Sequence, residues 1–131
     1  MKFAAWCSLS IGVLMLIQWT FFLAAGQVSE LQTEPVALGF HLAAELATAS
    51  ALIASGVMLL RGRPGAPATG LVANGMLIYT VIVSPGYLAQ LGQWPLVVMF
   101  IVVLGLALAS VVQLARGVAS SIQTGERHTV R

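Results

Sequence analysis

Four long runs of apolar residues dominate the sequence, and short segments rich in polar or helix-breaking residues separate them. A helix needs about 20 apolar residues to cross the hydrocarbon core of a bilayer, and each run is close to that length. The pattern therefore predicts an all-α integral membrane protein whose four transmembrane helices form an antiparallel bundle. We expect the spans at about 3–25, 36–60, 67–84 and 95–114.

Prolines and glycines mark the connections between these runs. Residues 26–35 form a polar loop, and Pro35 suits the start of a helix because its missing N–H would be unpaired there anyway. The segment Arg61–Gly65 predicts a basic turn. A further turn is predicted at Ser84–Tyr87, since the residue before a proline is pushed out of the helical conformation.

The four spans make one transmembrane domain at residues 1–115, followed by a polar segment at 116–131. This segment has no apolar periodicity, so we expect a disordered cytoplasmic tail. Of the whole chain, 59% of the residues are hydrophobic and 8% are charged, whereas a soluble domain carries roughly 25% charged residues. The composition therefore indicates the lipid bilayer as the solvent of the chain.

Charge and cysteine content narrow the function classes. The net charge of +2 is too small to suggest nucleic acid as a partner, and Cys7 as the only cysteine excludes an intrachain disulfide. The basic residues fall only at the N-terminus, between the second and third spans, and after the fourth span. By the positive-inside rule this pattern predicts a prokaryotic cytoplasmic (inner) membrane protein with both termini in the cytoplasm. These residues are Lys2, Arg61, Arg63, Arg116, Arg127 and Arg131.

A polar stripe interrupts the second span. His41, Glu45 and Thr48 follow one another at spacings of four and three, which puts them on one helix face. At 1.5 Å per residue, Glu45 lies about 14 Å below the start of the span and His41 about 8 Å below it. An ionised carboxylate at such a depth is costly without a partner, so intramembrane ionisable groups are candidates for function.

No Lys or Arg lies within a span, and Arg61 is about 24 Å from Glu45 along the helix. The partners are therefore expected among uncharged polar residues at matching depths of the neighbouring spans. These are Tyr79 and Thr80 for Glu45, and Gln18 and Ser84 for His41.

Two protonation states of this site remain open. Glu45 is neutral and hydrogen-bonded to Tyr79 or Thr80, or it shares a proton with His41 in a pair that switches between pH 5 and 8. The stripe is accordingly a site that handles protons or cations, or a polar clasp that fixes the register of the helices.

Small residues form a second stripe on the same span at four-residue spacing. Such a ridge lets another helix backbone approach closely. It predicts close packing within the bundle or an interface of a homo-oligomer. The ridge consists of Ala43, Ala47, Ala51 and Ser55.

The sequence contains few residues that could bind a cofactor or catalyse a reaction. A haem on His41 would need a second strong ligand, and a metal on His41 and Glu45 would need a third, so neither is predicted. The chain also lacks a nucleophile–base arrangement, a phosphate loop and paired carboxylates, so an enzyme is not the expected reading.

Several of these segments together resemble a group of small uncharacterised four-span prokaryotic membrane proteins. The resemblance covers Gln27 to about Phe100 and implies no activity. In size and number of spans the chain is also similar to DoxX-like proteins and to small multidrug transporters, although the latter carry their membrane glutamate in the first span. The segments are Glu34-Pro35, Phe40–Glu45, Tyr79 and Ser84–Tyr87.

Three functional hypotheses follow. The first is a small oligomeric transport protein coupled to protons, or moving a cation or solute, with Glu45 as carrier, His41 as its outer partner and Tyr79 as hydrogen-bond donor. The second is a structural or accessory subunit of a larger membrane complex, in which the same residues form a packing clasp. The third is a redox membrane protein that binds a cofactor.

Overall fold

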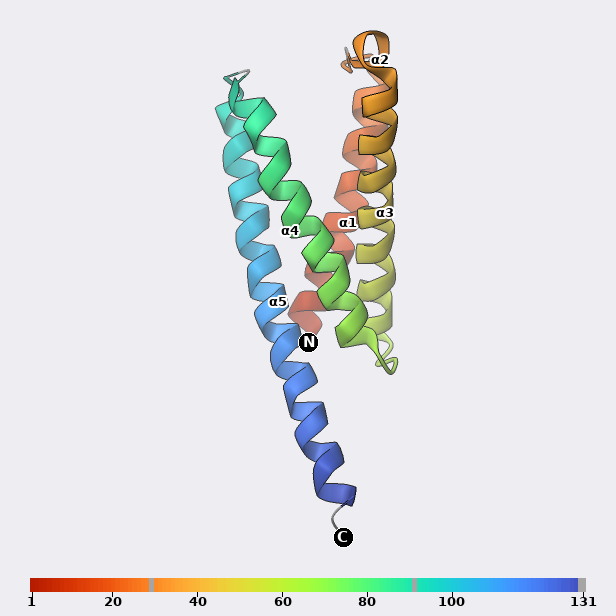
Figure 1. Ribbon diagram of the computed structural model, residues 1–131, viewed down its shortest axis with the longest axis vertical. Coiled ribbons are helices and arrows are strands. Elements are labelled where there is room, and N and C mark those ends of the chain that lie inside the picture. Colours follow the sequence, from red (N-terminus) through yellow and green to blue (C-terminus); the bar gives the residue numbers. More distant parts are fainter. Residues whose placement is uncertain (29, 91, 130–131) are drawn as a thin grey trace.

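The computed structural model describes residues 1–28, 30–90 and 92–129, and this part of the chain is helical apart from its connections. Four of the helices are long and apolar enough to cross a membrane, and they pack as a bundle (Figure 1). The predicted all-α architecture is thus confirmed. The helices are α1 (Lys2–Ala24), the short α2 (Glu30–Thr33), α3 (Pro35–Leu60), α4 (Ala66–Gln90) and α5 (Trp94–Thr129).

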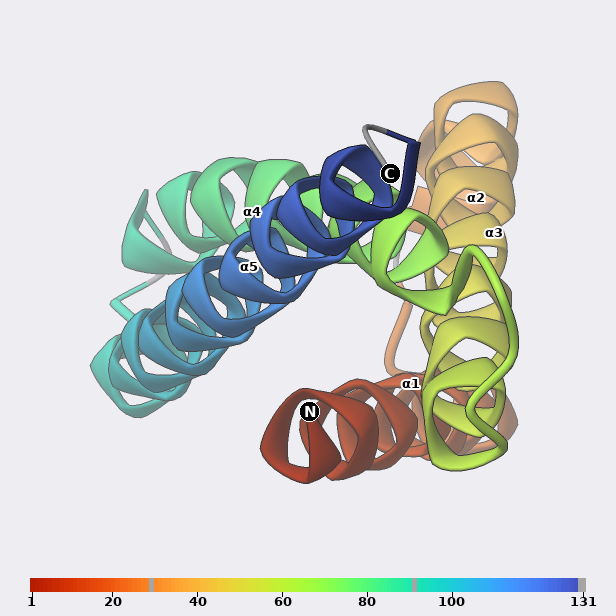
Figure 2. The ribbon, with the colours of Figure 1, turned by 90° about the horizontal axis from the view of Figure 1, so that it is seen from below.

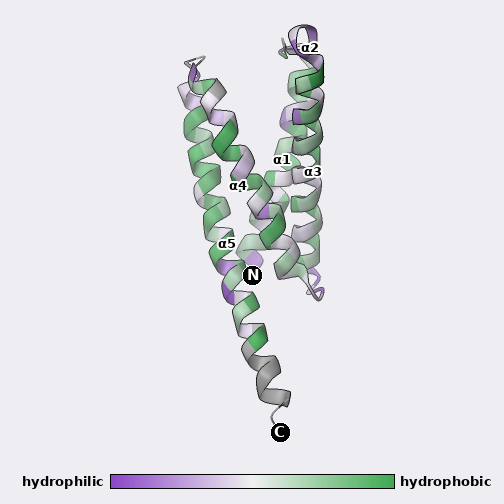
Figure 3. Cartoon of the chain, viewed as in Figure 1, coloured by the Kyte–Doolittle hydropathy of each residue, from purple (hydrophilic) through white to green (hydrophobic). Residues whose placement is uncertain are grey.

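The bundle consists of two antiparallel pairs of helices. Helices α1 and α3 form one pair and α4 and α5 form the other. The pairs meet at the end of the bundle where the chain begins and spread apart toward α2, as Figures 1 and 2 show from two directions. Hydrophobic residues make up most of each long helix, whereas hydrophilic residues are frequent at the connections (Figure 3). The bundle is therefore joined most closely in one half of its length.

Glycines allow the helices of each pair to approach closely. A Cβ atom at Gly12 of α1 would lie 2.9 Å from the backbone oxygen of Ala49, and a Cβ atom at Gly56 of α3 would lie 2.8 Å from that of Ala5. Both distances are shorter than van der Waals contact. These two contacts fix the register of α1 against α3.

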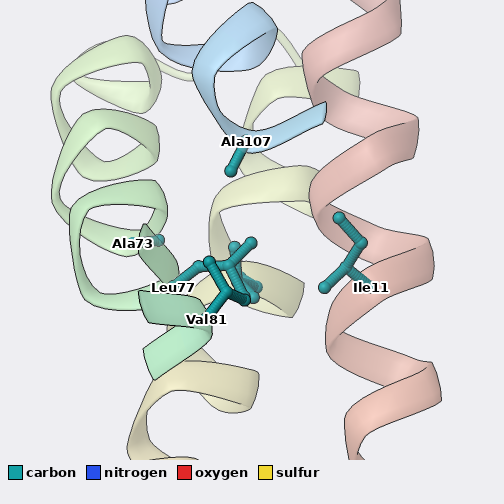
Figure 4. Packing of buried hydrophobic residues seen from close by; sticks show 6 residues of the cluster. Ile11, Ala73, Leu77, Val81 and Ala107 are labelled. Carbon is teal, nitrogen blue, oxygen red and sulfur yellow. The ribbon is translucent and has the colours of Figure 1, made fainter. Parts of the chain in front are cut away.

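All four long helices contribute to one apolar core. Its buried residues lie in the half of the bundle where the two pairs meet, and Figure 4 shows their side chains gathered between the helices. Alanine at the α4 and α5 positions keeps these helices close to their neighbours. The core residues are Ile11, Leu52, Ala73, Leu77, Val81 and Ala107.

The predicted turn at Ser84–Tyr87 is wrong. Helix α4 runs through Pro85 and ends at Gln90, so the third span is longer than the expected 67–84. A proline within a helix removes one backbone hydrogen bond, but a turn at membrane depth would leave several backbone groups unpaired in hydrocarbon. The chain instead reverses near Gly92, whose φ of 71° suits glycine.

The segment after the fourth span also differs from the expectation of disorder. Helix α5 continues without interruption to Thr129, and only residues 130–131 of the tail lie outside the described residues. Extending an existing helix avoids the cost of nucleating a new one, and no proline follows Pro95. The apolar span thus serves as the nucleus for a longer helix, while the cytoplasmic location of this end stays a prediction.

Candidate functional site

A histidine and a glutamate lie side by side within α3. The Nε2 atom of His41 lies 3.8 Å from the Oε1 atom of Glu45, one helical turn away. The exposed fraction is 46% for the His41 side chain and 8% for the Glu45 side chain. The imidazole therefore reaches the surface of the bundle, while the carboxyl group lies inside it.

Helix α1 completes this site with Trp19. Its ring meets the imidazole of His41 edge to face, with 5.5 Å between the ring centroids. The Trp19 side chain also lies close to the Glu45 carboxyl group, and because an indole is only a donor, the carboxyl group would be the acceptor in a hydrogen bond between them. The antiparallel register of α1 and α3 brings residue 19 level with residues 41–45. We call these three residues the Trp19–His41–Glu45 cluster.

Thr48 continues the polar face of α3 by one turn. Its side chain is buried, and its hydroxyl donates to the backbone oxygen of Ala44 at 2.8 Å. The hydroxyl hydrogen is thus bound within its own helix. Thr48 presents only its oxygen lone pairs to the neighbouring side chains.

The other polar residues proposed from the sequence lie elsewhere. Tyr79 is 71% exposed on the outer surface of α4, and Gln18, Thr80 and Ser84 are partly exposed. Within the described part of the chain, no hydrogen bond or ion pair joins any of the four to the cluster. Trp19 is the hydrogen-bond donor that depth matching missed. The signal in the sequence that could have identified it is the indole N–H of Trp19, a hydrogen-bond donor in the first span at the depth of His41.

The ridge of small residues is divided between two surfaces. Ala43 and Ala47 are exposed, Ala51 is half-buried, and Ser55 is fully buried with its hydroxyl donating to the Leu52 oxygen at 3.0 Å. The face of α3 that packs into the bundle is instead the one that carries Glu45. Its buried residues are Leu38, Glu45, Thr48, Ala49, Leu52, Ser55 and Gly56.

A second polar contact lies further from α2. Asn74 of α4 is 1% exposed, and its Nδ2 atom donates to Ser8 Oγ at 3.2 Å and to the Gly70 backbone oxygen at 2.9 Å. Sequence reasoning did not include Asn74 or Ser8 among the site residues. The available signal was the presence of polar residues within two apolar runs, with Ser8 in the first and Asn74 in the third.

The Trp19–His41–Glu45 cluster can bind and pass on a proton. The imidazole of His41 has a ring nitrogen that can bind a proton, and the carboxyl group beside it is a second acceptor. Among the described residues no three His, Cys, Asp or Glu side chains gather as metal ligands.

Replacing Trp19 by phenylalanine separates its two contacts. Trp19→Phe keeps an aromatic ring beside His41 but removes the N–H that can donate to Glu45. We expect the free energy of unfolding in mixed detergent–SDS micelles to fall by about 1 kcal/mol. Trp94→Phe at the exposed start of α5 is the matched control and should leave stability unchanged. Equal values for both variants would show that the indole N–H adds nothing.

Sequence comparison places this bundle in a family. No curated protein and no solved structure matches the chain. One family model, described as "Domain of unknown function (DUF8058)", matches residues 1–124. This match includes all four membrane-spanning helices, the Trp19–His41–Glu45 cluster and the contact between Asn74 and Ser8. The chain therefore belongs to the family defined by the domain of unknown function DUF8058.

Proposed function

We propose that the protein is a small proton-coupled transport protein that moves a cation or another solute. Glu45 carries the proton, and His41 exchanges it with water near the α2 end of the bundle. The observation that carries this proposal is the unequal exposure of the pair: 46% for His41 and 8% for Glu45, with 3.8 Å between the Nε2 and Oε1 atoms. An exposed proton donor beside a buried acceptor is the arrangement that proton transfer into a bundle requires.

The transfer step conserves charge within the pair. Protonated His41 and ionised Glu45 become neutral His41 and neutral Glu45 when the proton moves from Nε2 to Oε1. A small rotation of either side chain must first shorten the 3.8 Å separation to about 3 Å, the range of a proton-transferring hydrogen bond. The indole N–H of Trp19, which lies close to Glu45, can donate to the carboxylate before the proton arrives.

Transport also requires a path, and we propose that a homo-oligomer provides it. Four helices leave little room for a conduction path inside one copy. Ala43 and Ala47 are exposed on α3, and small residues on a lipid-facing surface allow another helix to approach closely. A second copy at this surface would lie on the same helix as the Trp19–His41–Glu45 cluster.

Proton flux into liposomes tests the proposal. Purified protein is reconstituted, a potassium diffusion potential is imposed with valinomycin, and internal pH is followed with a trapped dye. We expect wild-type protein to acidify the lumen faster than empty liposomes and Glu45→Gln to fall to the empty-liposome rate. Glu34→Gln makes the same chemical change at an exposed position and should retain the wild-type rate. A wild-type rate in Glu45→Gln would refute the role of Glu45.

A structural or accessory subunit is the second candidate. The observation that favours it is the contact of Trp19 in α1 with Glu45 in α3, which also fixes the register of these helices. In that case the Trp19–His41–Glu45 cluster is a packing clasp. The protein would then co-purify with a fixed membrane partner, and its liposomes would acidify no faster than empty ones.

A further inference from the structure

Each of the four long helices contributes one almost completely buried small polar residue to the half of the bundle where the pairs meet. The exposed fractions are 0% for the three serines and 1% for the asparagine. We call this group the Asn74 layer. It consists of Ser8 of α1, Ser55 of α3, Asn74 of α4 and Ser110 of α5.

Helix contacts show that the four residues lie at one level. Asn74 bonds directly to Ser8. Gly70, one turn before Asn74, lies against both Leu114 of α5 and Leu59 of α3. Because α5 and α3 run antiparallel to α4, one turn forward from Gly70 to Asn74 corresponds to one turn back on each neighbour. That step leads from Leu114 to Ser110 on α5 and from Leu59 to Ser55 on α3.

On the α1–α3 side the same level follows from Gly56. This glycine lies against the backbone of Ala5 and of Leu9, and Ser8 sits between those two residues in the sequence. Ser55, the neighbour of Gly56, is therefore level with Ser8. The layer crosses the whole bundle.

The donors of the layer are largely used. Ser55 donates its hydroxyl hydrogen to the Leu52 oxygen at 3.0 Å, and Ser110 donates to the Leu106 oxygen at 2.9 Å. Asn74 donates its two amide hydrogens to Ser8 Oγ and to the Gly70 backbone oxygen. What remains in the layer is mainly oxygen lone pairs.

One of these oxygens has no partner. The Oδ1 atom of Asn74 is buried and accepts no hydrogen bond from any residue that the structure describes. The reversed amide would place Oδ1 against the Gly70 oxygen at 2.9 Å, where two acceptors repel each other. A buried carbonyl oxygen without a partner is energetically unfavourable. The Oδ1 atom of Asn74 is therefore an acceptor that a bound ligand would stabilise.

We propose that the Asn74 layer binds a small monovalent cation through neutral oxygen atoms. Carbonyl and hydroxyl oxygens are the ligands that hard cations such as Na⁺ and Li⁺ prefer. The layer has no carboxylate, so it suits a single positive charge better than a divalent ion, which takes charged ligands in proteins. Asn74 Oδ1 is the central ligand, and Ser8, Ser55 and Ser110 supply hydroxyl oxygens.

A water molecule fits the layer less well. Water brings two lone pairs of its own that need donors, and buried waters make about three hydrogen bonds on average. In the layer only the Ser8 hydroxyl hydrogen is uncommitted. A cation has no lone pairs to satisfy, so it matches a site whose remaining groups are acceptors.

This cation site is separate from the proposed proton site. Ser55 lies ten residues beyond Glu45 on α3, which is about 15 Å along the helix axis. The inference stands whether or not the Trp19–His41–Glu45 cluster moves protons. Each can be tested without the other.

The test is thermal unfolding of the purified full-length protein in LiCl, NaCl, KCl and choline chloride at equal ionic strength. Because a ligand that binds only the folded state raises its stability, we expect at least one alkali cation to raise the Tm in a saturable way relative to choline. Asn74→Leu should abolish this shift, and Ser110→Ala should raise the half-saturating concentration about tenfold, which corresponds to about 1.4 kcal/mol. Ser110→Ala also gives a result if Asn74→Leu fails to fold.

Two controls isolate the site. Gln90→Leu makes a comparable change at an exposed position of α4, and Glu45→Gln alters the proton site; both should keep the cation shift. The proposal is overturned if wild-type Tm values are equal in all four salts, which would assign a water molecule or an unpaired oxygen to the layer. It is also overturned if Asn74→Leu and Ser110→Ala keep the wild-type shift.

Discussion

Replacing Gly56 by alanine should destabilise the bundle by about 1–3 kcal/mol, the range observed when a well-packed interface is overfilled. The new Cβ atom would lie 2.8 Å from the backbone oxygen of Ala5 and 3.1 Å from the Leu9 backbone nitrogen. Backbone atoms cannot rotate away as a side chain can, so α1 and α3 must separate. The separation would also loosen the contact of Trp19 with Glu45, which depends on the same register.

Gly39→Ala is the matched control for this substitution. Gly39 lies on the same helix, and a Cβ atom there would meet nothing within 4 Å. Since alanine is favoured over glycine within a helix by about 1 kcal/mol, this variant should be slightly more stable than wild type. The measurement is the free energy of unfolding during SDS titration in mixed micelles. A Gly56→Ala variant as stable as Gly39→Ala would disprove the close contact.

Leu52→Ala should be the most damaging truncation of an apolar side chain, at about 2 kcal/mol or more. Leu52 is fully buried and belongs to the core formed by all four long helices (Figure 4). Removing its branched end leaves a void that the fixed register of α1 and α3 prevents from closing. In a membrane the loss comes from missing packing contacts rather than from transfer into water.

Leu46→Ala makes the same change on a different face of α3. Leu46 is 50% exposed, so lipid tails fill the space left by its side chain. We expect a change of less than about 0.5 kcal/mol in the same SDS titration. Similar losses for both variants would mean that Leu52 does not pack at the centre of the bundle.

The sequence was sufficient to predict the number of spans and most of their ends. Long apolar runs and the breakers around Pro35 and Gly62 are local signals, and α3 begins and ends as they indicate. The turn predicted at Pro85 is absent because the cost of unpaired backbone groups in the membrane exceeds the cost of one proline within a helix. The extent of α5 was missed because the polar composition of residues 116–129 says little about a helix that propagates from an apolar span.

Rotation of each helix about its axis was the main feature that the sequence could not supply. Depth along a helix follows from counting residues, but the side that faces a neighbour depends on contacts such as Gly12 with Ala49. Tyr79 was therefore matched in depth with Glu45 and yet lies exposed on α4. The ridge of small residues predicts packing within the bundle or an interface of a homo-oligomer, and the structure places Ala43 and Ala47 on the exposed surface of α3, whereas Glu45 lies on the face that packs.

The pairing of His41 with Glu45 was accessible because both lie on one helix, where four-residue spacing fixes their proximity. Contacts between different helices are harder to predict from the sequence. Asn74 and Ser8 are 66 positions apart in the sequence, and neither has a charge that demands a partner. Their meeting depends on the packing of α4 against α1, which no local pattern encodes.

Helix α5 continues without a break, so its far end moves through a larger distance than the part inside the bundle when the helix tilts. Its 36 residues make a rod about 54 Å long, whereas the hydrocarbon core of a bilayer is about 30 Å thick. The far end extends well beyond the other helices (Figure 1). Because the same rod packs against α4 inside the bundle, any tilt of the α4–α5 pair is amplified at Thr129. A change in the tilt of these packed helices would thus become a larger displacement at the far end of α5.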